Sequence, residues 1–190
     1  HVTYRAGDQP NNAFSLNVFK KGQTALSGGT SGVIYSLTDF QSVKKNLKLN
    51  YFAHIDYSDK VRSIGELACI NGAGAMLKWL KNLFGENSYQ NMDKIAATTS
   101  IGSNKLAVFP FGNGSERILD NQNIGGQFSS INFNIHSKAQ FFRATIEGIA
   151  FAFVYTMGIM KKNNYSFKNL KACNDNLFKS EIFSETIATL

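Results

Sequence analysis

The chain has 190 residues, of which 43% are hydrophobic and 13% are aromatic. A chain of this length and composition can bury one substantial core, which excludes a disordered or fibrous protein and favours a single domain. The formal net charge of +7 would suit nucleic acid, an acidic membrane surface or phosphates. However, the lysines are scattered and no basic stripe with interleaved aromatics occurs, so we expect no nucleic-acid partner.

The two cysteines, Cys69 and Cys173, lie far apart and show neither metal-ligand spacing nor the pattern of a disulfide framework. This usage is typical of a cytoplasmic protein. The sequence shows no run of eighteen apolar residues and no secretion signal, so we expect no membrane partner. The chain starts with His1 instead of Met, and Leu190 falls inside a helical pattern. We therefore expect a piece of a longer polypeptide.

Strand-like and helical patterns alternate along the chain. Strands are predicted over residues 2–7, on both sides of a Gly/Ser turn within 23–39, and over 47–57, 62–70, 105–112 and 168–173. Helices are predicted over residues 13–22, 71–85, 88–97, 137–162 and 176–190. The strand over 105–112 is expected to be buried, and Ser137 is expected to cap the long helix that follows it. Several strands followed by alternating strands and helices indicate an α/β or α+β domain with a mixed sheet.

Three glycine-bearing turns are candidates for chemistry. In "SGGTSG", residues 27–32, glycines let backbone N–H groups approach an anion, and Thr30 and Ser31 add hydroxyl donors. The alternative is an ordinary hairpin turn. "NGAG", residues 71–74, lies where a helix begins, so it fits either a phosphate or tight packing. Asp8 follows Gly7, and it fits either a catalytic base or a turn or capping carboxylate.

These motifs occur in a characteristic order. "AGDQPNNAF", "LSGGTSGVIYSLTD", "CINGAGAMLKWLKN" and "FGNGSER" followed by "RATIEGIAFAF" together resemble the carboxy-terminal domain of the FGGY family of carbohydrate kinases. The resemblance covers nearly the whole chain and is strongest to the xylulose kinase branch. It implies an α/β fold of the actin-like, ribonuclease-H-like ATPase type, with a mixed sheet flanked by helices.

The same resemblance implies an activity. The expected reaction is transfer of the γ-phosphate of ATP to a sugar hydroxyl, with D-xylulose as the favoured substrate and Mg²⁺ bound with the ATP phosphates. Other acceptors remain open, among them glycerol, gluconate and another pentulose, as does a catalytically silent nucleotide-binding domain. ATP, the sugar and a missing amino-terminal domain of the same chain are the expected partners, and a homodimer is a further option.

The resemblance also implies roles for individual residues. Asp8 would accept the proton of the attacking hydroxyl and would contact the sugar together with Gln9. Residues Gly29, Thr30 and Ser31 would hold the ATP phosphates, and Gly74, Lys78, Cys173 and Asn176 would line the nucleotide. Cys173 stands where the family usually has a glycine, which puts the adenine contacts there in question. The histidines lack ligand-spaced partners, so we expect no metal site made by protein ligands alone.

Overall fold

A computed structural model of the chain describes residues 6–43 and 46–190, so most of the strand predicted over residues 2–7 lies outside the described residues. The described helices are α1 (Asp8–Ser15), α2 (Ala73–Leu83), α3 (Tyr89–Ala96), α4 (Lys138–Lys162) and α5 (Glu181–Thr189). The described strands are β1 (Gln23–Gly28), β2 (Gly32–Asp39), β3 (Asn50–Ala53), β4 (Ser63–Ile70), β5 (Ala107–Phe111), β6 (Gly125–Ser129) and β7 (Asn169–Ala172).

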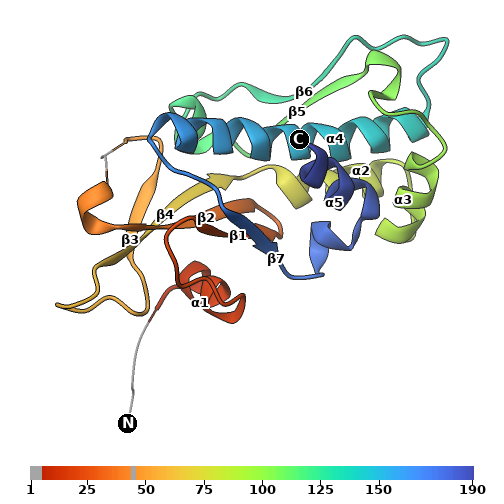
Figure 1. Cartoon of the computed structure of the whole chain (residues 1–190). Helices are drawn as coiled ribbons and strands as arrows, with labels where there is room; N and C mark the ends of the chain where they lie inside the picture. Colours follow the sequence, from red (N-terminus) through yellow and green to blue (C-terminus); the bar gives the residue numbers. More distant parts are fainter. Residues whose placement is uncertain (1–5, 44–45) are drawn as a thin grey trace.

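A five-stranded sheet in the order β3-β4-β2-β1-β7 forms the centre of the domain (Figure 1). β1 pairs antiparallel with β2 and parallel with β7, whereas β4 pairs antiparallel with both of its neighbours. The sheet is therefore mixed, as the sequence predicts. β5 and β6 form a separate antiparallel pair.

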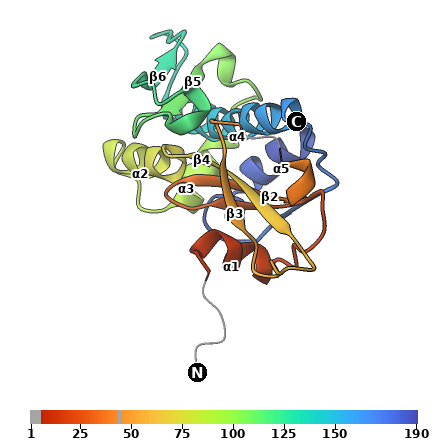
Figure 2. The same cartoon turned by 90° about the vertical axis from the view of Figure 1, so that its left-hand side faces the viewer.

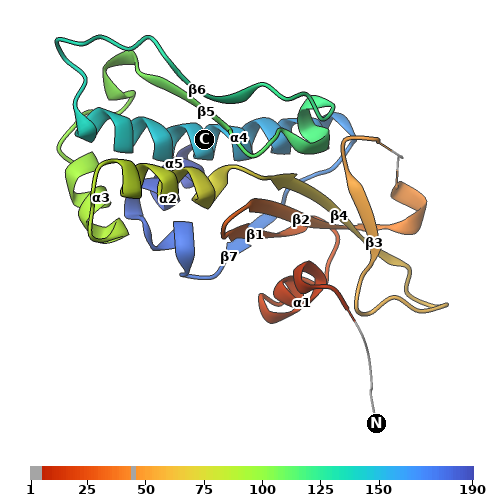
Figure 3. The ribbon, with the colours of Figure 1, turned by 180° about the vertical axis from the view of Figure 1, so that it is seen from behind.

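Helix α4 lies between the five-stranded sheet and the β5–β6 pair, with α2, α3 and α5 beside it (Figures 1 and 3). It approaches β5 closely at Gly148, where an added Cβ would lie 2.5 Å from the carbonyl oxygen of Val108. Helix α1 packs on the opposite face of the sheet (Figure 2). The two faces of the sheet are thus covered by helices of very different length.

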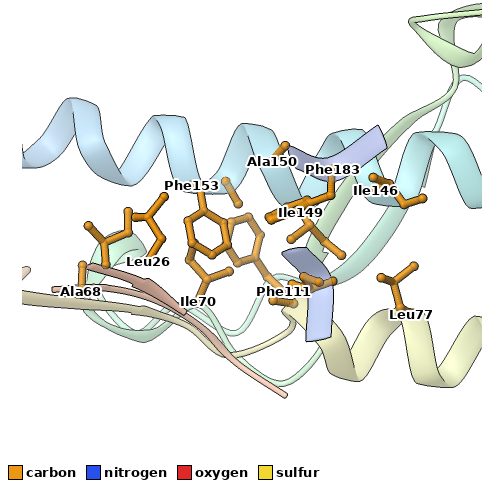
Figure 4. Packing of buried hydrophobic residues seen from close by; sticks show 14 of the residues in the cluster. Leu26, Ala68, Ile70, Leu77, Phe111, Ile146, Ile149, Ala150, Phe153 and Phe183 are labelled. Carbon is orange, nitrogen blue, oxygen red and sulfur yellow. The ribbon is translucent and has the colours of Figure 1, made fainter. Parts of the chain in front are cut away.

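The main core fills the space between the sheet and α4 (Figure 4). Ile149 and Phe153 of α4 are fully buried there against Ile70 of β4 and Phe183 of α5. By length and composition α4 could cross a membrane, but 61% of its most apolar window is buried inside the protein. Its apolar character is explained by this burial in the core.

A polar row crosses the same face of the sheet. The strand register places Thr24, Ser36, Glu66 and Tyr51 side by side on β1, β2, β4 and β3. The Thr24 and Ser36 hydroxyl oxygens are 2.9 Å apart. Glu66 is 2% exposed, and burial raises the pKa of its carboxyl group to about 7. Because a buried carboxylate lacks the solvation that water provides, Glu66 favours its neutral form.

Several predicted boundaries are confirmed. Ser137 closes a capping box with Gln140 at the start of α4, and the Ser88 hydroxyl accepts the amide N–H of Asn91 at the start of α3. These caps satisfy amide donors that a helix would otherwise leave free at its first turn. The two strands around the Gly/Ser turn, the strand ending at Ile70 and the strand over 169–172 also form.

Two predictions about local structure are wrong. The first helix spans Asp8–Ser15 instead of 13–22, because Asn17 takes a left-handed backbone conformation and Val18 turns into the core beneath the sheet. The strand predicted as buried, β5, alternates: Val108 is buried whereas Phe109 is 44% exposed. It belongs to a two-stranded sheet, which has only one face against α4.

Candidate active site

A pocket of about 500 Å³ opens where α1, the β1–β2 turn and the strand surface meet. Its lining combines Asp8 and Gln9 of α1, Gly29, Thr30 and Ser31 of the turn, and Ser27, Val33, Leu67 and Cys69 of the strands. Residues predicted for two separate tasks, proton transfer and phosphate binding, thus line one cavity. The fold brings them together from positions more than twenty residues apart in the sequence.

Asp8 is the first residue of α1, directly after the N-cap residue Gly7. Its Oδ1 accepts the amide N–H of Gln9 at 3.0 Å, and its Oδ2 accepts the side-chain amide of Gln9 at 3.2 Å. A carboxylate in the first turn also interacts favourably with the helix dipole. Asp8 therefore has a local structural role and, because it is exposed within the pocket lining, a side chain that a ligand can reach.

The turn at residues 29–31 is fixed by the start of α2. The carbonyl of Gly29 accepts the N–H of Gly74 at 3.2 Å, and that of Thr30 accepts the N–H of Ala75 at 3.1 Å. In a trans peptide unit the N–H points opposite to the C=O. The amides of Thr30 and Ser31 therefore point away from α2, as an anion-binding turn on the pocket wall requires.

Gly74 contacts the phosphate-binding candidate turn directly. A Cβ at this position would lie 2.3 Å from the carbonyl oxygen of Gly29. The N–H of Gly74 already donates to the Gly29 carbonyl. The contribution of Gly74 is therefore that, without a side chain, it lets the start of α2 lie close to the turn. Lys78 lies one turn further along α2, is exposed, and does not line the pocket.

The two remaining predicted residues lie at the end of β7 and just beyond it. Asn176 begins a short 3₁₀ helix, Asn176–Lys179, and Cys173 is exposed. The same short helix packs against β1, since a Cβ at Gly28 would lie 2.7 Å from Cβ of Leu177. Neither Cys173 nor Asn176 lines the pocket, but the segment that carries them lies next to the β1–β2 turn.

Sequence reasoning missed the strand residues of the pocket wall, Val33, Leu67 and Cys69. Leu67 is directly opposite Tyr35 and Cys69 is directly opposite Val33 across the β2–β4 pair, so all point to the face that carries α1. Burial raises the pKa of the Cys69 thiol, which therefore stays protonated. The period-two spacing of Leu67 and Cys69 was a usable signal for one shared face.

The potential metal ligands of the pocket suit a metal ion that is bound mainly by the phosphates of a nucleotide. Among the described residues, no group of three His, Cys, Asp or Glu side chains could hold an ion. The pocket lining has one carboxylate and three hydroxyl residues, and Mg²⁺ commonly uses few protein ligands together with phosphates and water. A phosphate-bound Mg²⁺ fits this lining. A second hollow of about 360 Å³, between α2 and the β5–β6 pair, contains none of the predicted site residues.

No family model matches the chain. It is 30% identical to a xylulose kinase of Staphylococcus epidermidis over 165 residues, which cover 86% of this chain and 32% of that protein. It is 28% identical to a gluconokinase of Bacillus subtilis over 147 residues, covering 72% of this chain and 28% of that protein. The chain thus spans about a third of the length of these relatives.

The chain is similar to carbohydrate kinases of the FGGY family over the part that it shares with them. Its fold agrees: a xylulose kinase structure from Rhodospirillum rubrum matches with a TM-score of 0.83 and 21% identity, over 96% of this chain and 36% of that chain. A Plasmodium falciparum glycerol kinase with ADP matches with a TM-score of 0.84 and 17% identity, over 96% and 36%. The fold is the actin-like ATPase fold that the sequence resemblance implies.

Proposed function

We propose that this chain is the carboxy-terminal domain of an FGGY-type kinase that transfers the γ-phosphate of ATP to a sugar hydroxyl, with D-xylulose as the favoured substrate. The observation that carries the proposal is the single pocket shared by Asp8 and the turn Gly29–Ser31. The 30% identity to a xylulose kinase supports the choice of sugar. Both cysteines are free thiols, as is usual in the cytoplasm, where we place the protein.

In this proposal Asp8 acts on the acceptor. Its carboxylate accepts the proton of the sugar hydroxyl as that oxygen forms a bond to the γ-phosphorus, and the bond from this phosphorus to the bridging oxygen of ADP breaks. Gln9 shares the pocket with Asp8 and hydrogen-bonds both of its oxygens, so Gln9 orients the carboxylate and can contact the sugar.

The turn residues act on the phosphates. The N–H groups of Thr30 and Ser31, with both hydroxyls, would donate to the negative charge on the transferred group. Gly29 allows the phosphate to approach the backbone closely. Bound Mg²⁺ would neutralise charge on the β- and γ-phosphates. Gly74, Lys78, Cys173 and Asn176 remain the predicted lining for the rest of the nucleotide.

A kinase acting on another polyol or sugar acid is the second candidate, favoured by the match to a gluconokinase. This domain leaves the acceptor undecided, since we expect most sugar contacts from an amino-terminal domain of the same protein. A panel of sugars offered to the full-length protein, with ADP release measured for each, separates these candidates. The highest kcat/KM is expected with D-xylulose.

The function itself is tested by Asp8→Asn in the full-length protein. An amide cannot accept the hydroxyl proton, so kcat should fall by about 10²- to 10⁴-fold while ATP binding persists. Asp59→Asn changes an exposed carboxylate on the loop before β4 and is the matched control. Turnover of Asp8→Asn close to that of the control would contradict the role of Asp8 as the base.

The 190-residue chain alone provides a complementary test. Correct placement of reactants can account for roughly 7–11 kcal/mol of a barrier. Without the second wall of the cleft, the chain should fold and bind ATP weakly but release no ADP in response to sugar. Sugar-dependent turnover by the chain alone would contradict the two-domain proposal.

A further inference from the structure

Asn71 occupies the junction between β4 and α2. It follows the last residue of β4 and precedes Gly72, the N-cap residue of α2. At Gly72 the backbone touches the end of β5 so closely that an added Cβ would lie 1.6 Å from the carbonyl oxygen of Pro110. The junction is therefore packed against the end of β5, just before the 113–116 loop.

The Asn71 side chain joins the loop over residues 113–116, which follows β5, to the pocket wall. Its Nδ2 donates to Oε1 of Glu116 at 2.9 Å and to the carbonyl of Asn113 at 3.4 Å. Its Oδ1 accepts from Sγ of Cys69 at 3.4 Å. The Asn71 amide thus bridges two parts of the fold. Its nitrogen binds the 113–116 loop, and its oxygen binds the strand that lines the candidate active site.

Two routes lead from Asn71 to the phosphate-binding turn. The first is the backbone: three residues after Asn71, the N–H of Gly74 holds the carbonyl of Gly29. The second is the thiol of Cys69, which lies beside the Ser31 side chain in the pocket lining. A displacement of Asn71 would therefore reach the turn from both sides.

We propose that Asn71, held by Glu116, is a positioning residue that fixes the turn Gly29–Ser31 through Cys69 and the start of α2. This inference rests on the proposed kinase function. Asn71 is not among the residues that line the pocket, so its influence on the turn is indirect. Its effect is on placement, and it should therefore lower kcat more than it raises the KM for the sugar.

The test compares Asn71→Ala, Glu116→Ala, their double variant and Glu116→Gln in the full-length protein. Asn71→Ala and Glu116→Ala should each lower kcat by about tenfold, less than the roughly 100-fold that a 1 Å misplacement can cost. The double variant should lose no more than Asn71→Ala alone, since the contact that Glu116→Ala removes is already absent there. Glu116→Gln keeps an oxygen acceptor for Nδ2 and should restore most of the rate.

A second readout needs no catalysis. Labelling with N-ethylmaleimide, quantified by mass spectrometry, should reach Cys69 several-fold faster in Asn71→Ala, with exposed Cys173 as the internal reference. Asn123→Ala, an exposed amide in the loop before β6, is the matched control and should leave the Cys69-to-Cys173 ratio unchanged.

The outcomes separate the two proposals. An unchanged labelling ratio in Asn71→Ala overturns the positioning role, as does a double variant whose loss is the product of the single losses. A wild-type protein that phosphorylates no sugar contradicts the proposed function, and the labelling ratio still decides whether Asn71 holds the pocket wall.

Discussion

The two faces of the five-stranded sheet differ in how much they bury. Among the described residues, the cluster between the sheet and α4 contains 23 buried hydrophobic residues, whereas the cluster beneath α1 contains seven. α4 has 25 residues and α1 has eight. Helix α1 is too short to cover this whole face of the sheet. The part that it leaves uncovered, at Val33, Leu67 and Cys69, forms a wall of the pocket.

This difference assigns most of the stability to the α4 face and the candidate active site to the α1 face. Burial of apolar surface stabilises by about 25 cal/mol per Å², so most of the folding free energy comes from the α4 face. The α1 face is free to leave a cavity with polar groups beside it. Each face can therefore be perturbed on its own, and the variants below test whether the effects stay separate.

The largest effect on stability is expected from Phe153→Ala on the α4 face. Phe153 is fully buried between Gly32 of β2 and Phe183 of α5. Truncation leaves a cavity and should lower the free energy of unfolding by about 3–5 kcal/mol, measured by urea denaturation. Phe151→Ala, two residues earlier and 52% exposed, should change it by less than about 1 kcal/mol. Equal losses for both would contradict this description of the core.

Glu66 should make the α4 face sensitive to pH. Its pKa in the folded protein, about 7, exceeds its ordinary value of 4.5, so folding binds a proton between these values. Stability from the neutral form is complete below about pH 4.5 and is lost as the pH rises through 7, by roughly 3 kcal/mol in all.

Glu66→Gln should remove this loss, and the variant should be more stable than the wild type at pH 8 in denaturation curves measured at each pH. The exposed Glu185→Gln is the control and should keep the wild-type slope. If both variants follow the wild-type curve, burial of Glu66 is not the source of the pH dependence.

The smallest effect on stability, with a clear effect on binding, is expected from Gly74→Ala in α2, which acts on the turn that lines the pocket. The added Cβ would lie 2.3 Å from the Gly29 carbonyl and must displace the turn. The Kd for ATP should rise about tenfold, or 1.4 kcal/mol, by calorimetry on the full-length protein. Gly158→Ala in α4, where a Cβ meets nothing within 4 Å, is the matched control. ATP affinity that is equal in both variants would show that the turn does not hold phosphate.

The elements with strong local signals were predictable. The glycine-rich turn between β1 and β2 can be recognised from a few neighbouring residues. The same holds for Ser137 as the cap of α4 and for the apolar sequence of α4 itself. β6 was missed because its sequence, "GGQFS", has little strand preference of its own and depends on pairing with β5. The first helix was misplaced because the burial of Ala13 inside it and of Val18 after it depends on packing against the sheet.

The candidate site was predictable only in part, for a related reason. Asp8 and the turn Gly29–Ser31 carry motifs that can be read from the sequence, and the structure places them in one pocket. Cys69 and Asn71 lie inside the quoted "CINGAG" stretch, but their contacts could not be read from it, since those depend on the β2–β4 register and on the loop at Glu116. Contacts between elements distant in the sequence leave no local pattern.

The parallel pairing of β1 with β7 has a consequence for biosynthesis. Gln23 pairs with Asn169, so β1 receives its second neighbour only after nearly the whole chain has left the ribosome. Until then one edge of β1 presents unpaired backbone groups, which invite pairing with other chains. The short helix that packs beside Gly28 comes after β7 in the chain, so this side of the β1–β2 turn is completed last. A nascent chain that stalls before residue 169 therefore exposes an aggregation-prone edge on the strand that leads into the candidate phosphate turn.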